Sequence, residues 1–154
     1  MKRYLLAAAA ALVMPAVAQA QDMGSGLYAG AQAGYHDFRG GFDSTFVGGY
    51  VGFNAPLGEM LVAGAEGNAN VAVDGDADYE YGVSAHLGFR TGNGMIFGRV
   101  GYQEVDFEGG VSDGDVMYGV GGEFGLNERS AFRVTVDTIS FDTTRVAAGV
   151  SFKF

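Results

Sequence analysis

The sequence contains no cysteine, no tryptophan, two prolines and only nine basic residues among its 154. The absence of cysteine excludes a disulfide scaffold, a zinc–thiolate site, a cysteine nucleophile and a lipid-modified cysteine anchor. The basic residues are outnumbered by 18 acidic ones, which gives a formal net charge of −9. Binding to nucleic acid needs basic patches against the phosphates, so we predict no nucleic-acid partner.

Long hydrophobic runs are also scarce. The one such run, Tyr4–Ala18, follows a short basic start, contains a proline and ends at the small-x-small triplet Ala18-Gln19-Ala20. This order is typical of a cleaved secretory signal peptide. A membrane anchor is the alternative, but the run is too short to span about 30 Å of hydrocarbon comfortably. We therefore predict a signal peptide at residues 1–20 and one domain at residues 21–154.

Glycine is abundant, at 27 of 154 residues, and follows no G-X-Y period, which excludes collagen. After the signal peptide, apolar and polar residues alternate with the period of two of β-strands, interrupted by turn residues. We predict eight strands, at residues 27–35, 45–54, 60–72, 79–90, 95–104, 116–127, 131–138 and 145–154. Their number is even, and most have the roughly 9–11 residues that a tilted strand needs to cross a membrane.

The predicted connections differ in length and charge. Three are tight turns, at residues 56–59, 91–94 and 127–130. The other four are mostly longer and strongly acidic, around residues 37–44, 73–78, 105–115 and 139–144. Longer loops on one side and short turns on the other are typical of outer-membrane barrels, so we predict both termini in the periplasm, on the side of the tight turns.

One face of every predicted strand is free of charge, while the other carries charged and amide side chains interspersed with glycine. A soluble barrel and a transmembrane barrel both satisfy this alternation. Glycine beside long charged side chains favours a narrow lumen, and the outward aromatic residues sort by end. Those at the tight turns are Phe53, Phe89, Phe124, Phe132, Phe152 and Phe154, and those at the acidic end are Tyr35, Tyr79, Tyr81, Tyr102 and Tyr118. Two aromatic girdles are typical of membrane barrels, so we predict an all-β, eight-stranded antiparallel transmembrane up-and-down barrel.

The last eight residues, Ala147 to Phe154, carry a more specific signal. They resemble the C-terminal signal that the barrel-assembly machinery reads, with Gly149, Phe152 and Phe154 in the expected places. Together with the signal peptide and the eight strands, they make the chain similar to the small outer-membrane β-barrel family of Gram-negative bacteria. This family includes the opacity-protein and porin-like group and the membrane domain of outer membrane protein A. The resemblance implies an outer-membrane location and the assembly machinery as a partner.

The lumen of an eight-stranded barrel is just wide enough to be filled by side chains, and a charge buried there needs a partner. Glu66, Arg99, Glu123 and Arg133 fall on predicted lumen positions. The membrane domain of outer membrane protein A has acids and bases in the same order on the same strands. The resemblance therefore implies two cross-lumen pairs, Glu66–Arg133 and Arg99–Glu123. We favour a static plug over a gate for a narrow pore.

Two weaker patterns point to other chemistry. Ser84 and His86 lie on the lumen face near acidic residues, a combination that some lipid A-modifying barrels use. A lumenal position is wrong for attack on lipid, so we predict no enzyme activity. Asp74, Asp76 and Asp78 resemble the start of a calcium loop, but the glycine needed at the sixth position is replaced by Tyr79. We treat these three residues as a weak cation site and predict no specific metal and no cofactor.

The resulting functional prediction is a non-enzymatic outer-membrane barrel with a structural, envelope-integrity or surface-interaction role. The alternatives are a narrow gated pore for ions or small solutes and, with less support, a lipid A-modifying enzyme. The predicted partners are outer-membrane lipids and lipopolysaccharide, which the acidic loops would contact through divalent cations.

Overall fold

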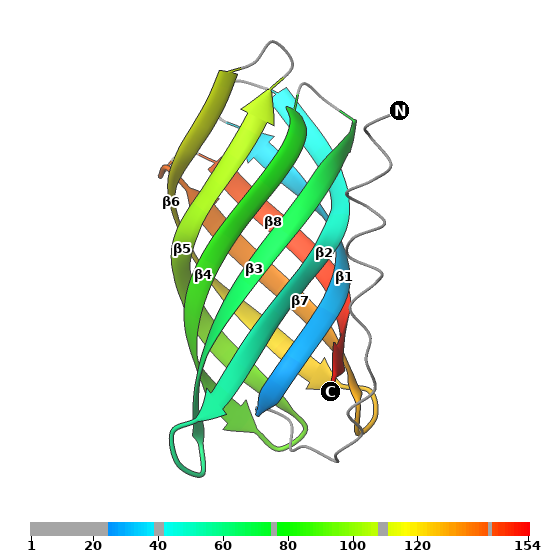
Figure 1. The fold of residues 1–154 in the computed structure, drawn as a ribbon, viewed down its shortest axis with the longest axis vertical. Helices are drawn as coiled ribbons and strands as arrows, with labels where there is room; N and C mark the ends of the chain where they lie inside the picture. The colour runs from blue at the N-terminus through cyan, green and yellow to red at the C-terminus, as the bar shows by residue number, and fades with distance from the viewer. Residues whose placement is uncertain (1–24, 39–41, 75–76, 108–110, 142) are drawn as a thin grey trace.

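The structure, a computed structural model, describes residues 25–38, 42–74, 77–107, 111–141 and 143–154. Each strand pairs antiparallel with the next along the chain, and β8 pairs with β1, which closes the sheet into a barrel (Figure 1). The strands are β1 (Gly26–Phe38), β2 (Phe42–Pro56), β3 (Leu61–Asp74), β4 (Ala77–Thr91), β5 (Gly94–Phe107), β6 (Val111–Gly125), β7 (Ser130–Ile139) and β8 (Thr143–Lys153). The predicted eight-stranded antiparallel barrel is confirmed.

The described residues contain no helix that is long and apolar enough to cross a membrane.

All eight strands continue further toward the acidic end than the sequence analysis predicts. The connections at that end contain only residues 39–41, 75–76, 108–110 and 140–142, so the prediction of longer acidic loops is wrong. Strand β5 shows the reason: Val105 is buried between the outward residues Glu104 and Asp106, so the alternation continues with charge on the outer face. Charge does not end a strand where that face contacts water instead of lipid.

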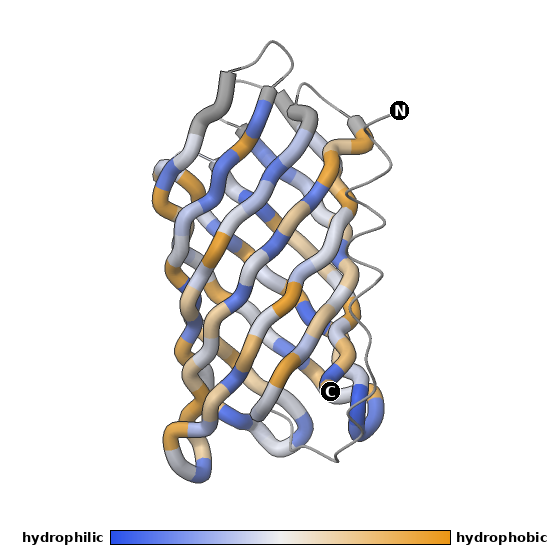
Figure 2. Tube along the Cα trace, viewed as in Figure 1, coloured by the Kyte–Doolittle hydropathy of each residue, from blue (hydrophilic) through white to orange (hydrophobic). Residues whose placement is uncertain are grey.

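The two faces of the barrel are distributed as predicted. Apolar side chains on the outer face are exposed, with Val83 at 65 %, Val120 at 64 % and Phe53 at 53 %. Figure 2 shows hydrophobic and hydrophilic residues alternating along the strands. Charged and amide side chains such as Arg145 and Gln103 are buried inside. This distribution excludes the soluble-barrel alternative, which needs its apolar face inside.

The lumen also contains aromatic rings, which the sequence analysis did not place there. Each of four inward rings lies against the glycine directly opposite on a neighbouring strand. These pairs are Tyr28–Gly52, Phe46–Gly34, Tyr50–Gly30 and Phe97–Gly121. A Cβ atom added to any of these glycines would lie 2.3 to 2.4 Å from the aromatic side chain. Many lumenal glycines are therefore the space that a ring from the next strand occupies.

Backbone hydrogen bonds join the chain ends to neighbouring segments at the end of the barrel where β1 begins and β8 ends. The Phe154 amide donates to the Leu27 carbonyl at 3.0 Å, and the Lys153 amide donates to the Arg129 carbonyl at 2.8 Å. In the neighbouring turn, Asn127 Oδ1 accepts hydrogen bonds from the amides of Arg129 and Ser130, both at 2.9 Å. These contacts fix the register of β8 against both of its neighbours.

Candidate functional site

The candidate site is the lumen, and Glu66 on β3 is its central acid. Its Oε2 atom lies 2.5 Å from Arg133 Nη1 and accepts a hydrogen bond from the Tyr28 hydroxyl at 2.8 Å. Its Oε1 atom lies 3.2 Å from Arg99 Nη1. One buried carboxylate thus neutralises guanidinium groups from two other strands, β5 and β7.

The ion pairs continue from Arg99 toward the acidic end of the barrel. Arg99 Nε lies 3.0 Å from Asp137 Oδ1, and Arg145 Nη1 lies 3.1 Å from Asp137 Oδ2. Arg145 also donates from Nη2 to Glu80 Oε1 at 3.0 Å, and Glu80 Oε2 lies 2.5 Å from His36 Nε2. From Arg133 to Glu80, bases and acids alternate through the whole chain of contacts, and every member is buried.

A separate pair fills the lumen nearer the termini, where Lys153 Nζ lies 2.9 Å from Glu123 Oε1. With this pair included, the ion pairs that the described residues form in the lumen join four bases, Arg99, Arg133, Arg145 and Lys153, to four acids, Glu66, Glu80, Glu123 and Asp137. Burying a charge without a partner costs on the order of several kcal/mol. The balance of the two signs is what permits a charged interior in this narrow barrel.

The structure brings together one of the two pairs that the resemblance implies. Glu66 and Arg133 are in contact, whereas Arg99 contacts Glu66 and Asp137, and Glu123 contacts Lys153. The register explains the difference. On the adjacent strands β5 and β6, Arg99 is opposite Gly119, while Glu123 is opposite Met95. Arg99 and Glu123 are therefore two inward positions apart along the barrel.

The arginines are further stabilised by aromatic faces. The Arg133 guanidinium carbon lies 4.8 Å from the ring centres of both Tyr50 and Phe97. The Arg145 guanidinium carbon lies 4.4 Å from the ring centre of Phe46. Cation–π contacts of this kind strengthen when the cation is removed from water. The rings therefore supply part of the solvation that the two buried arginines lose.

Four polar contacts pass over a glycine on the strand between their partners, a feature that the sequence analysis missed. They are Gln32–Asn70 over Gly48, Asn54–His86 over Gly64, Asn68–Gln103 over Gly82 and Arg99–Asp137 over Gly119. A Cβ atom on any of the four glycines would lie 2.2 to 2.4 Å from a polar atom of the pair. The signal in the sequence is polar–glycine–polar across three consecutive strands, and it can be read only once the register is known.

Ser84 and His86 are both buried in the lumen, away from the lipid-facing wall. His86 Nε2 lies 2.7 Å from Asn54 Oδ1, and the His86 ring packs against Phe97 with 5.5 Å between ring centres. Among the described residues, Ser84 Oγ has no hydrogen-bond partner. The hydrogen bond between nucleophile and base that acyl transfer requires is not formed by this pair.

The remaining predicted site residues are placed as follows. Asp76 and the side chains of Asp74 and Asp78 lie outside the described residues, so the weak cation site stays a prediction. The part of the chain that the structure describes contains no group of three or more His, Asp or Glu residues able to hold a metal ion. Phe152 is half-exposed on the outer wall, and Gly149 faces the lumen opposite both Arg133 and Gln32.

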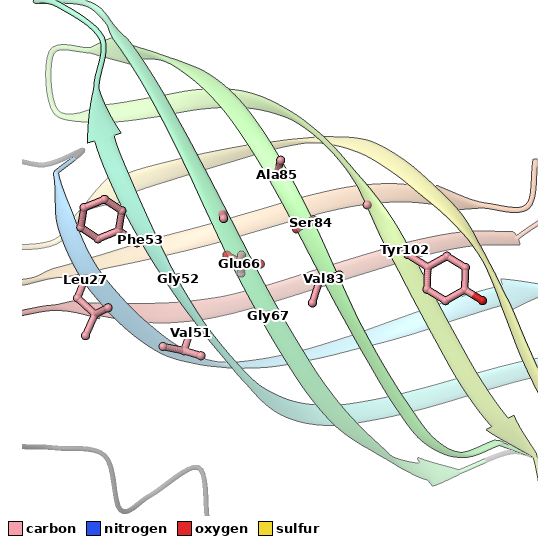
Figure 3. Close-up of a pocket in the computed structure, with 12 residues that line it drawn as sticks. Leu27, Val51, Gly52, Phe53, Glu66, Gly67, Val83, Ser84, Ala85 and Tyr102 are labelled. Atoms are coloured by element: carbon pink, nitrogen blue, oxygen red, sulfur yellow. The ribbon is translucent and has the colours of Figure 1, made fainter.

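The outer wall carries a shallow groove of about 730 Å³ over β1–β5 (Figure 3). Its lining includes the small residues Ala65, Gly67 and Ala85 together with larger side chains such as Phe53 and Tyr102. Its accessible surface is almost entirely apolar and faces outward, where lipid chains contact a membrane barrel.

Comparison with known structures finds barrels of the same architecture. Ail, the attachment invasion locus protein of Yersinia pestis, matches with a TM-score of 0.59 at 14 % identity, over 86 % of this chain and 100 % of Ail. Neisserial surface protein A matches with a TM-score of 0.55 at 15 % identity, over 86 % and 100 %. The N-terminal barrel of Pseudomonas aeruginosa OprF matches with a TM-score of 0.53 at 13 % identity, over 86 % and 100 %.

A search of curated protein sequences finds no match. A family model described as the outer membrane protein beta-barrel domain matches residues 5–154, nearly the whole chain. With the closed barrel, the apolar outer wall and the charged lumen, this match shows that the chain belongs to the outer membrane β-barrel domain family and is a protein of the bacterial outer membrane.

Proposed function

We propose that this protein is a non-conducting, non-enzymatic barrel that contributes to the structure of the outer membrane and presents an acidic rim for surface contacts. The observation that carries the proposal is the filled lumen, in which ion pairs run from Arg133 through Glu66, Arg99 and Asp137 to Arg145. A permeating ion would have to separate buried charges that are paired with one another, which costs on the order of several kcal/mol.

The rim supports the second half of the proposal. Strands β1–β6 have 13 to 15 residues, more than the roughly 9–11 that cross the bilayer. Their excess lies at the acidic end, where Asp37, Glu104 and Asp106 are on the outer face. Carboxylates at this level suit contact with lipopolysaccharide through divalent cations. Two structural relatives bear names that refer to attachment and to the cell surface.

Conductance in planar bilayers tests the closed lumen. The natural protein and the Glu66→Gln variant would be reconstituted, with the turn variant Glu128→Gln as a matched loss of one exposed carboxylate. We expect no stepwise current from the natural protein or from Glu128→Gln. Reproducible single-channel steps from the natural protein would overturn the proposal in favour of a narrow pore. That alternative has one observation in its favour, the sharing of Glu66 between two arginines.

The absence of catalysis is tested by lipid analysis. Cells producing the natural protein or the His86→Ala variant would be compared for lipid A structure by mass spectrometry. We expect identical lipid A in both strains and in cells without the protein. A modification that requires His86 would assign the barrel to the lipid A enzymes.

Export and assembly complete the proposal. We infer cleavage of the signal peptide after Ala20, with both termini on the periplasmic side and Gly149, Phe152 and Phe154 read by the assembly machinery. Intact mass measurement of the membrane protein tests the cleavage site. Substitution of Phe154 by Ser is expected to reduce the heat-modifiable, folded fraction in outer-membrane preparations, whereas Phe141→Ser, at the opposite end, is not.

A further inference from the structure

The β7–β8 hairpin ends well short of its neighbour β6 at the acidic rim. Strands β7 and β8 have 10 and 11 residues, and the last β6–β7 pair is Met117–Ile139, whereas β6 continues to Val111. In Figure 1 the connection between β7 and β8 lies below the upper end of β6. This hairpin therefore turns close to the level of Tyr118, which is opposite Thr138, and below the end of β6.

The turn itself holds an unusual backbone conformation. Ser140 and Phe141 have φ values of 57° and 64°, in the left-handed region that residues other than glycine rarely adopt. The hairpin is held to β6 at two points: the Ser140 amide donates to the Val116 carbonyl at 3.2 Å, and the Ser140 hydroxyl donates to the Asp115 carboxylate. Such strain persists only where the surrounding contacts maintain it.

The consequence of this conformation is the position of the Phe141 ring. Phe141 is 76 % exposed, the highest value among the large apolar side chains of the described residues. Its ring packs against Tyr118, a girdle residue on the outer wall, with 5.4 Å between ring centres and a tilt of 54°. The ring thus extends the lipid-facing outer wall beyond Tyr118, and the Asp115 carboxylate accepts the Ser140 hydroxyl at the same hairpin.

We propose that Phe141 anchors the β7–β8 hairpin in the lipid interface of the leaflet at the acidic rim. In this proposal the exposed ring lies at the boundary between lipid headgroups and acyl chains, where aromatic side chains are enriched in membrane proteins. Continuity with Tyr118 selects lipid over a protein partner, because the ring stands beside a lipid-facing residue and below the end of β6. The inference depends on the membrane location of the barrel and not on its closed lumen.

The absence of tryptophan from the chain permits a direct test with single-tryptophan variants. Phe141→Trp would be reconstituted in phosphatidylcholine bilayers whose acyl chains carry bromine either near the headgroup or near the methyl end. We expect a blue-shifted emission and at least twofold stronger quenching by the shallow bromine. Val120→Trp, deeper on the same strand wall, should be quenched more by the deep bromine. Glu128→Trp, in an exposed turn at the opposite end, should be quenched by aqueous iodide only.

The outcomes separate the alternatives. A Phe141→Trp emission that is accessible to iodide and insensitive to both bromolipids would overturn the proposal. So would a blue shift that depends on protein concentration and not on bromine, because that result indicates contact with a second copy. Heat-modifiable gel migration confirms that each variant is folded. Phe141→Asn supplies a second measurement, since asparagine tolerates a positive φ and removes only the ring. Its hairpin amides should exchange severalfold faster in bilayers than those of the natural protein.

Discussion

Glu66 is the residue on which the lumen contacts converge, since it binds Arg133, Arg99 and the Tyr28 hydroxyl. Replacing Glu66 with Gln keeps the size of the side chain and leaves Arg133 without a carboxylate partner at this site. Removing one partner of a buried ion pair costs about 3–5 kcal/mol. We expect a loss of this size in the free energy of unfolding, measured by urea titration in lipid vesicles.

The matched control is Glu128→Gln, which removes the same charge from an exposed turn. Its effect should stay within about 0.5 kcal/mol of the natural protein. Equal stabilities for Glu66→Gln and Glu128→Gln would show that the buried charges contribute no net stability to the folded barrel.

Glycine allows a second prediction at the scale of the residue, because the two faces of one sheet provide opposite environments. A Cβ atom at Gly119, in the lumen, would lie 2.3 Å from Asp137 Oδ1 and from the Val136 carbonyl. At Gly67, on the outer wall, the nearest atom would be the Gly82 carbonyl at 3.8 Å. We expect Gly119→Ala to destabilise the barrel by about 1–3 kcal/mol and Gly67→Ala to be neutral or slightly stabilising.

Urea unfolding midpoints of the two alanine variants, measured side by side, check this difference. A barrel that tolerates both substitutions equally would mean that the lumen can relax around a methyl group at Gly119. The same comparison would then weaken the interpretation of lumenal glycine as occupied space.

The sequence predicts the side of the sheet on which a residue lies better than it predicts the partner of that residue. The period of two assigned Glu66, Arg99, Glu123 and Arg133 to the lumen, because facing depends only on parity along each strand. Which residues form an ion pair depends also on the register between strands, and the alternation of inward and outward positions does not specify that register. Glu123 and Arg99 share a face on adjacent strands, yet the register separates them by two inward positions.

At the scale of the strand, the error in the predicted boundaries has a physical cause. Acidic residues and glycine have low β-propensity, so the predicted strands ended where these residues began. The structure continues through them because each added residue pairs with the opposite strand of its hairpin, as in Glu104–Gly114 and Asp106–Ser112. The connections shrink accordingly, and the rim is made of hairpins instead of loops.

Hydrogen exchange measures the extent of these strands. We expect the amides of residues 103–106 to exchange at least tenfold more slowly than those of the turn at residues 126–129, because the former pair on both sides within the sheet. Mass spectrometry of peptides from the barrel in detergent micelles gives both rates in one experiment. Rapid exchange at residues 103–106 would support the longer acidic loop that the sequence suggested.

At the scale of the whole molecule, the charges separate by location. Among the described residues, the four bases and four acids of the lumen ion pairs cancel one another, so the net negative charge comes from residues outside this set. Most of it falls, in the sequence, on the strand ends away from Gly26 and Lys153 and on the segments that connect them, which contain eleven acidic residues and one base outside the ion pairs, Arg39. The acidic residues are Asp37, Asp43, Asp74, Asp76, Asp78, Glu104, Asp106, Glu108, Asp113, Asp115 and Asp142. The eight ion-paired lumen residues are therefore balanced in charge, and the sequence is strongly negative at one rim.

This asymmetry predicts a dependence on divalent cations. In the β1–β2 register Asp37 is directly opposite Asp43, and like charges in opposed positions destabilise a strand pair by roughly 0.2–1 kcal/mol. Magnesium screens such repulsion and bridges carboxylates to the phosphates of lipopolysaccharide. We expect magnesium to raise the urea midpoint of the natural protein, more in bilayers that contain lipopolysaccharide than in phosphatidylcholine alone.

The double variant Asp37→Asn/Asp106→Asn should lose at least half of the additional increase in the urea midpoint. The control variant Glu59→Gln/Glu128→Gln, which removes two charges from turns at the opposite end, should keep that increase. An equal response of the two double variants would assign the magnesium effect to the lipid and not to the rim.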